Sequence, residues 1–240
     1  GYTLLVGAMD THVINPTLYG KRVPFHGIDD FQPVDMLAYA AVVLAVHPGV
    51  PAQNVAELIA LAKGRPGQLR FTNAGAGSNS HLLTVLLERR TGIDTQRIPH
   101  RGSAAAVSEV AGGNADVVFS AWTVIEPYVR SGRLRPLAVT TRDKAASLPA
   151  LPTVAETVPG FDLGIYYGLF AARGTPREIV ERLNFHANAL IDRPAVRARL
   201  LEQGLEPVRR TPEQFEKQLR DDYARWSKLI PELNIEPEPE

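Results

Sequence analysis

The chain has 240 residues, which is enough for one large domain or for two lobes with a substantial core. Its 26 basic and 26 acidic side chains balance, so the bulk charge gives no reason to expect a nucleic acid or an anionic membrane surface as a partner. Cysteine is absent, which excludes disulfides, thiolate nucleophiles and Cys-ligated metals, and no apolar run approaches the roughly 20 residues that insert across a bilayer.

The chain opens with a predicted strand. Tyr2–Val6 is almost entirely apolar, which is typical of a strand buried on both faces in a parallel sheet. The loop that follows carries Thr11 and His12 at the carboxyl end of this strand, where open α/β sheets hold their ligands. Both are therefore candidate binding residues, although a histidine in such a loop more often serves only a local hydrogen bond. No signal peptide is visible. Because the strand begins so abruptly, we expect the gene product to start upstream of Gly1.

A second apolar run, Asp35–Val46, is long enough to pass from one lobe to another, and it ends at a Pro-Gly turn. A helix follows, capped by Asn54 and ending at Lys63. Further along, short strands alternate regularly with helices, which predicts a parallel α/β sheet. Strands are expected at 68–72, 95–98, 116–120 and 134–140, and helices at 80–90, 104–111 and 124–130. Pro136 places the last of these strands at a sheet edge or near a strand start.

A glycine-rich loop, Asn73–His81, follows one of these strands and opens the next helix. Its glycines admit positive φ and leave room for a bound group, and Ser78 is a residue type that caps helix starts. The free N–H groups of the first helical turn, with the positive end of the helix dipole, make a seat for a carboxylate or a phosphate. The spacing matches neither a P-loop nor G-x-G-x-x-G. An ordinary capped turn between strand and helix fits the same residues equally well.

Loops of the same kind end other strands. Gly102 and Ser103 follow one strand and Ser120 ends another, so each brings a hydroxyl or free backbone N–H groups to the start of a helix. Several such loops meeting at a crevice suit the recognition of a small polar anion without covalent chemistry. Trp122 and Tyr166 are candidates for lining the pocket, although core packing is the usual role of aromatic side chains. The candidate ligand-binding residues are Thr11, His12, Thr72, Asn73, Ala74, Gly75, Gly77, Ser78, Ser80, His81, Gly102, Ser103, Ser120, Trp122 and Tyr166.

The C-terminal third is predicted to be mainly helical. A strand at 162–170 is the second candidate for a crossing between lobes. Thr175 and Thr211 are each followed by proline, a sequence that starts helices. The helices are expected at 175–192, 194–204 and 211–229. The acidic, proline-rich tail at 236–240 is expected to be disordered.

The sequence offers little for catalysis, and we expect no enzyme. The six histidines lack the spacing of metal ligands, so neither a metal nor another cofactor is expected. Ser78 or Ser80 with His81 leaves a small hydrolase as an alternative, but G-x-S-x-G is absent and no orienting carboxylate stands out. A second alternative is the effector-binding domain of a transcription regulator. The lack of a helix-turn-helix or a basic segment argues against it.

Several short motifs occur in a fixed order between Gly1 and about Ile230. They are Gly1–Leu5 with Thr11-His12, Asp30–Val34, Val46–Pro48, Asn73–Ser78 with Ser80-His81, Pro99–Ser103, Leu137–Thr140, Pro152–Glu156, Gly168–Phe170 and Gly174–Pro176. Each motif alone is modest, but the ordered set is specific. In that order they resemble the motifs of the Bug-type substrate-binding proteins of the tripartite tricarboxylate transporter family.

This resemblance implies a periplasmic receptor with the type II binding-protein fold, in which two lobes close around a small carboxylate. The lobes are α/β, with parallel or mixed sheets flanked by helices. Residues 1–40 and 171–240 form lobe 1, and residues 41–170 form lobe 2 with the ligand-facing loops. The implied ligand is a di- or tricarboxylate, an acidic amino acid or an aromatic acid, held largely by backbone N–H groups and waters. The implied partner is the membrane permease of the transporter.

The chain departs from the family pattern in several places, and these departures bear on which acid is bound. Members usually carry Tyr where His100 stands, often Asp where Ser120 stands, and a Trp-type aromatic near Tyr166. The opening β-α-β-α portion of the family, with the export signal and a loop that supplies the facing half of the carboxylate clamp, does not appear here. If that portion is missing from the protein, we expect an exposed apolar sheet edge on lobe 1 and weak affinity, or a partner chain that fills the gap.

Overall fold

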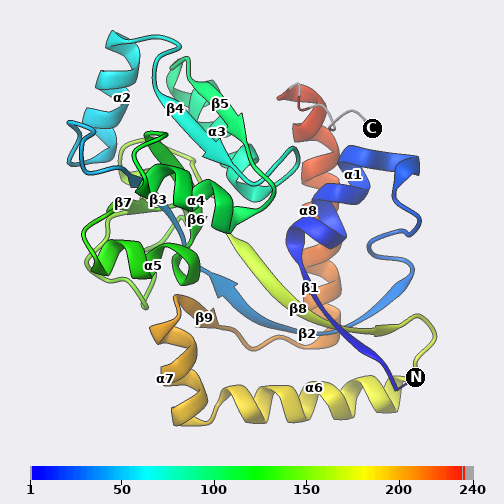
Figure 1. Ribbon diagram of the computed structural model, residues 1–240. Helices are drawn as coiled ribbons and strands as arrows, with labels where there is room; N and C mark the ends of the chain where they lie inside the picture. Colours follow the sequence, from blue (N-terminus) through cyan, green and yellow to red (C-terminus); the bar gives the residue numbers. More distant parts are fainter. Residues whose placement is uncertain (1, 234, 236–240) are drawn as a thin grey trace. The chain divides into compact units, whose positions relative to one another are not determined.

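The computed structural model describes residues 2–233 and 235, and the tail at 236–240, expected to be disordered, lies outside the described residues. Contacts divide the chain into two compact units. Of the described residues, the first takes those up to Ala40 and those from Ile165 to Ile235, and the second takes Ala41–Gly164. Each unit is a β-sheet flanked by helices, which confirms the α/β class with mixed sheets (Figure 1).

The first unit is built on a four-stranded sheet of order β1-β8-β2-β9, in which neighbouring strands are antiparallel. Its strands are β1 (Leu4–Ala8), β2 (Phe31–Ala40), β8 (Ile165–Ala172) and β9 (Leu205–Pro207). Its helices are α1 (Asn15–Tyr19), α6 (Arg177–Ile191), α7 (Pro194–Glu202) and α8 (Pro212–Glu232), with a π-helix at Asp10–Ile14 and a 3-10 turn at Gly20–Arg22. Helix α8 begins as the sequence predicted, because Thr211 and Gln214 form a capping box.

Strand β1 corrects the prediction of a buried strand. Its side chains are among the exposed large hydrophobic residues, and Val6 is 61% exposed. The reason is position, because β1 lies at the end of the sheet order, with β8 as its described neighbour. An apolar run cannot distinguish an edge strand from a central one. The first unit therefore carries an exposed apolar sheet edge.

The second unit contains a five-stranded sheet of order β5-β4-β6-β3-β7. Its strands are β3 (Val42–Val46), β4 (Arg70–Asn73), β5 (Gln96–Pro99), β6 (Val117–Ala121) and β7 (Arg135–Val139). Its helices are α2 (Val55–Gly64), α3 (Asn79–Thr91), α4 (Ser103–Ala111) and α5 (Trp122–Arg130), with a 3-10 turn at Val154–Glu156. Strand β4 is parallel to β5 and β6, as expected, but β3 is antiparallel to β6 and β7, so the sheet is mixed. Pro136 lies in the edge strand β7, as its missing N–H predicts.

Packing in the core of the second unit fixes the parallel strands relative to one another. Strand β3 is buried throughout, and Ala106 and Val110 of α4 pack in one cluster with Val118 of β6. At the other end of the strands, Nη2 of Arg70 lies 2.9 Å from Oδ1 of Asp116, which precedes β6. These contacts fix the register of β4 and β6, so the loops after the parallel strands leave the sheet at the same edge.

The chain passes between the units at Ala40/Ala41 and at Gly164/Ile165. The second point lies at the start of β8, whereas the sequence placed the boundary after residue 170 because 162–170 is a single strand-like run. All of β8 pairs with β1 and β2, so the whole strand belongs to the first unit. That the two units are the lobes of a receptor that closes on its ligand stays a prediction.

Candidate ligand-binding site

The glycine-rich loop connects β4, which ends at Asn73, to α3, which begins at Asn79. Gly75 and Gly77 have φ of 105° and 73°, conformations in which a side chain would be strained. Ser78 caps α3 as expected, because its Oγ accepts a hydrogen bond from the His81 N–H at 3.3 Å. The loop is thus a sharp turn that places the first turn of α3 next to the carboxyl end of strand β4.

Most polar groups of this loop are used within the loop itself. The Ala74 N–H donates to Ser80 Oγ at 3.0 Å, and the Gly75 N–H donates to Asn73 Oδ1 at 3.0 Å. Ser78 Oγ lies 2.6 Å from the Gly75 carbonyl oxygen, to which it donates. These bonds make the two serines part of the scaffold of the loop.

The start of α3 offers two N–H groups to a ligand. The first four N–H groups of a helix have no intrahelical acceptor. The His81 N–H uses Ser78 Oγ, and the Leu82 N–H donates to the Ser78 carbonyl at 3.0 Å. The N–H groups of Asn79 and Ser80 find no acceptor in the part of the chain that the structure describes. Together with the positive end of the dipole of this 13-residue helix, they make a candidate anion seat.

Three polar side chains near this seat lack hydrogen-bond partners among the described residues. They are Asn79, in which both amide atoms are unpaired, His100 at Nε2 and Ser120 at Oγ. Asn79 is 5% exposed and Ser120 is 6% exposed. Buried polar groups normally find a partner, so unpaired ones are typical of a place where the partner comes from outside the chain.

These three residues lie at one edge of the sheet. Asn79 follows β4, His100 follows β5 and Ser120 lies near the end of β6, and these strands are parallel neighbours. The His100 N–H donates to the Asn73 carbonyl at 2.8 Å, which ties the two loops together. The sequence analysis proposed Ser120 and the loop Asn73–His81, in which Asn79 lies, but not His100. A polar residue in a first helical turn looks like part of a cap, so the sequence carried no separate signal for Asn79.

A positive charge lies beside the loop. Nη1 of Arg97, on β5, is 3.5 Å from Nε2 of His81, and His81 Nδ1 accepts a bond from the Gly77 N–H at 3.4 Å. Arg97 is also 3.9 Å from the carboxylate of Glu88 on α3. Burial raises the pKa of Glu88, and Thr95 and Arg97 act in the opposite direction. Arg97 was not among the sequence candidates, because nothing in its own segment pairs it with His81.

The other candidates of the second unit have structural contacts. Thr72 is fully buried, and its Oγ1 donates to the Ala106 carbonyl at 3.1 Å, which joins β4 to α4. Gly102 has a φ of 101° and precedes α4, where Ser103 is the first, exposed residue. Trp122 is partly buried and packs on the hydrophobic cluster beneath α4 and α5. The structure therefore gathers Asn73–His81, Gly102, Ser103, Ser120 and Trp122 around the carboxyl edge of one sheet.

The first unit contains the remaining candidates, and His12 is fully buried there. Its Nδ1 lies 2.8 Å from the Gly27 carbonyl, and since a carbonyl only accepts, Nδ1 carries the proton. The ring stacks on Phe170 with 3.9 Å between centroids, and burial lowers the pKa of His12, which favours the neutral imidazole. The side chain is therefore part of the core of this unit. Thr11 is exposed, and its N–H donates to Asp10 at 3.0 Å.

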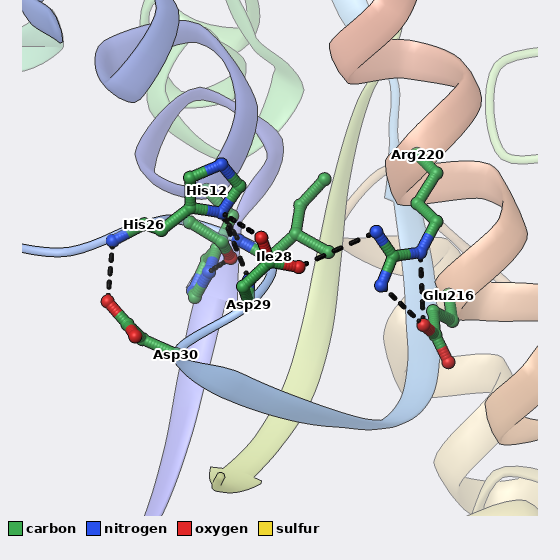
Figure 2. A network of polar contacts seen from close by, with 8 residues as sticks. His12, His26, Ile28, Asp29, Asp30, Glu216 and Arg220 are labelled. Atoms are coloured by element: carbon green, nitrogen blue, oxygen red, sulfur yellow. Dashed lines mark hydrogen bonds and ion pairs between the residues drawn. The ribbon is translucent and has the colours of Figure 1, made fainter.

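Figure 2 shows the loop that His12 supports. His12 lies on one side of this loop, and Arg220 of α8 lies on the other, with Nη1 3.5 Å from Asp29 Oδ1. Inside the loop, the His26 N–H donates to Asp30 Oδ2 at 2.6 Å. The loop that precedes β2 is thus fixed from both sides.

Tyr166 also lies in the core of the first unit, where it is 2% exposed. Its hydroxyl donates to Asp222 Oδ2 at 3.0 Å, and burial raises the pKa of both groups. Core packing, the usual role of aromatics, therefore accounts for Tyr166 in this structure. None of the helices in the described part of the chain combines the length and the hydropathy needed to cross a membrane.

Comparison with known proteins identifies the family. The family model described as "Tripartite tricarboxylate transporter family receptor" matches residues 1–235. BugT of Bordetella pertussis is 33% identical over 97% of this chain and 72% of its own length.

Solved structures give the same result. The structure of R. palustris Rpa4515 with adipate superimposes with a TM-score of 0.91 at 33% identity, covering 99% of this chain and 80% of that one. MatC of Rhodopseudomonas palustris with bound malate gives a TM-score of 0.82 at 28% identity, covering 95% of this chain and 79% of that one. The chain belongs to the receptors of the tripartite tricarboxylate transporter family, in which the Bug proteins are its relatives, and it has their periplasmic binding-protein fold.

Proposed function

We propose that this protein is an extracytoplasmic receptor that binds a small carboxylate in the periplasm and presents it to a membrane permease. The observation that carries the proposal is the pair of N–H groups at the start of α3, on Asn79 and Ser80, beside a loop whose other groups are largely satisfied internally. Such a pair suits the two oxygens of a carboxylate. The adipate of Rpa4515 and the malate of MatC support the same ligand class.

We also propose that the protein has no catalytic activity. A hydrolase would need a serine whose hydroxyl is free to be activated by a histidine base. Ser78 Oγ instead donates to the Gly75 carbonyl at 2.6 Å and accepts from the His81 backbone. The Nδ1 atom of His81 accepts from the Gly77 N–H. These bonds support a role in loop geometry and anion binding.

The first test is a thermal-shift screen with adipate, malate, succinate, citrate, aspartate and nicotinate. A ligand that binds only the folded state stabilises it by about 2.7 kcal/mol at a hundredfold excess over Kd, so at least one acid should raise Tm by several degrees. Sodium chloride at equal ionic strength is the control. If no acid in the panel shifts Tm for the folded protein, the carboxylate proposal fails.

The second test removes the scaffold of the loop with Ser78→Ala. This change deletes the cap of α3 and the bonds from Oγ to Gly75 and Ser80, so we expect about 1 kcal/mol lower stability and roughly tenfold weaker carboxylate binding. Thr211→Ala is a matched control, because the Thr211 side chain caps α8 in the first unit and, like Ser78 Oγ, accepts a bond from the N–H three residues on. It should lower stability by about as much and leave affinity unchanged. Equal affinity for the two variants in isothermal titration calorimetry would argue against the loop as the binding site.

A further inference from the structure

The unpaired side chains beside the anion seat share one chemical property. Asn79, His100 and Ser120 each present atoms without partners among the described residues, and an amide, an imidazole and a hydroxyl can each donate or accept a hydrogen bond. The amide of Asn79 offers a donor and an acceptor, both unpaired. A ligand group that fits them is therefore one that donates and accepts hydrogen bonds without carrying charge.

The placement of these side chains connects them with the seat. Asn79 also supplies one of the two free N–H groups, so its side chain and the seat belong to the same first turn of α3. In a helix the Cα–Cβ bond tilts toward the N-terminus, which directs a first-turn side chain toward the helix start. His100 and Ser120 come from the loop after β5 and the end of β6, the two strands beside β4. Polar groups without partners among the described residues thus lie beside the anion seat, on neighbouring strands.

We propose that Asn79, His100 and Ser120 form a specificity subsite that selects carboxylates bearing a hydroxyl group over their deoxy analogues. The inference rests on the proposed carboxylate-binding function and names the ligand class within it. The carboxylate occupies the N–H groups of α3, and the hydroxyl supplies the donor and acceptor that the three side chains lack. A site built to hydrogen-bond a hydroxyl rejects the analogue without it, because its buried polar groups then stay unpaired.

The test compares matched pairs of acids by isothermal titration calorimetry on the whole chain. The pairs are malate and succinate, lactate and propionate, 3-hydroxyglutarate and glutarate, and mandelate and phenylacetate. In the pair of the right length, the hydroxy acid should bind about tenfold more tightly or better. Equal affinity within every pair that binds would overturn the subsite and leave the receptor proposal intact. Absence of binding by all eight acids would also overturn the subsite, whereas the receptor proposal fails only if the acids of the thermal-shift panel do not bind either.

Variants then assign the selectivity to residues. Ser120→Ala and Asn79→Leu should each weaken binding of the hydroxy acid about tenfold and leave binding of the deoxy acid nearly unchanged. The ratio of the two affinities should therefore fall to about one. Neither variant should lower Tm appreciably, because each removes an unpaired buried polar group. Ser108→Ala, on the exposed face of α4, is the control and should keep the wild-type ratio. A wild-type ratio in both test variants would contradict the assignment.

Discussion

Gly27→Ala is expected to destabilise the first unit by about 3 kcal/mol, at the upper end of what overpacking a core costs. A Cβ atom at Gly27 would lie 1.9 Å from the carbonyl oxygen of His12 and 2.7 Å from its carbonyl carbon. Both are backbone atoms, so no side-chain rotation relieves the clash. Separation of the two segments would also break the bond from His12 Nδ1 to the Gly27 carbonyl and disturb the stacking of His12 on Phe170.

Urea denaturation followed by circular dichroism measures this loss as a lower midpoint at unchanged slope. Gly64→Ala is the matched control, because Gly64 ends α2 and a Cβ there meets no atom within 4 Å. Alanine favours the helix over glycine by about 0.8–1 kcal/mol in a helix interior, so this control should be neutral or slightly stabilising. If the unfolding free energy of Gly27→Ala stays within about 0.5 kcal/mol of the wild-type value, Gly27 does not pack tightly against the backbone of His12.

Asp35→Asn is expected to stabilise the protein above neutral pH. Asp35 is fully buried in β2, and its Oδ2 accepts a bond from Asn188 Nδ2 at 2.9 Å. The remaining oxygens of the pair, Asp35 Oδ1 and Asn188 Oδ1, have no partner among the described residues. An asparagine at position 35 can offer both an oxygen to Nδ2 and an N–H group to Oδ1 of Asn188. The substitution therefore removes a buried charge and can complete the hydrogen bonding of the pair.

The effect depends on pH in a defined direction. Burial raises the pKa of Asp35 to about 7 from its usual 3.8, while the backbone of Arg210 and Met36 and then the charge of Arg209 act in the opposite direction. Between these two values the folded protein binds more protons than the unfolded chain, so stability falls as pH rises from about 4 to 7 and then levels off. This shift in the pKa of Asp35 corresponds to a loss of unfolding free energy on the order of 2–4 kcal/mol between about pH 4 and pH 7.

Unfolding free energies at pH 4.5 and pH 8 check this prediction. At pH 8 the unfolding free energy of Asp35→Asn should exceed that of the wild type by roughly 2 kcal/mol. At pH 4.5 the difference should be small, because the wild-type carboxyl is already neutral at that pH. Asp221→Asn is the control, since Asp221 is exposed in α8 and pairs only at the surface with Lys217. It should change stability by no more than about 0.5 kcal/mol. A destabilised Asp35→Asn variant at pH 8 would contradict a buried, unfavourable carboxylate.

What the sequence predicted well was local. The caps at Ser78 and Thr211 need only the residues of one helical turn, and both are present. Pro136 marks an edge strand because the missing N–H is a property of the residue itself. The ordered motifs also identified the family, because they span nearly the whole chain.

What the sequence did not predict depends on distant partners. The burial of His12 is set by Gly27 and Phe170, and that of Tyr166 by Asp222, far away in the chain. The exposure of β1 depends on which strand pairs with it, and the direction of β3 depends on sheet pairing that no local pattern encodes. The unpaired amide of Asn79 was not predicted for the same reason, because its lack of partners is visible only once its neighbours are placed.

The internal hydrogen bonds of the loop between β4 and α3 have a kinetic consequence. Because Asn73, Ser78 and Ser80 already hold the turn in shape, an arriving acid does not have to order it, and the entropic penalty of binding is correspondingly small. Different acids should then associate at similar rates, and the affinity differences among them should appear in how long each one stays bound.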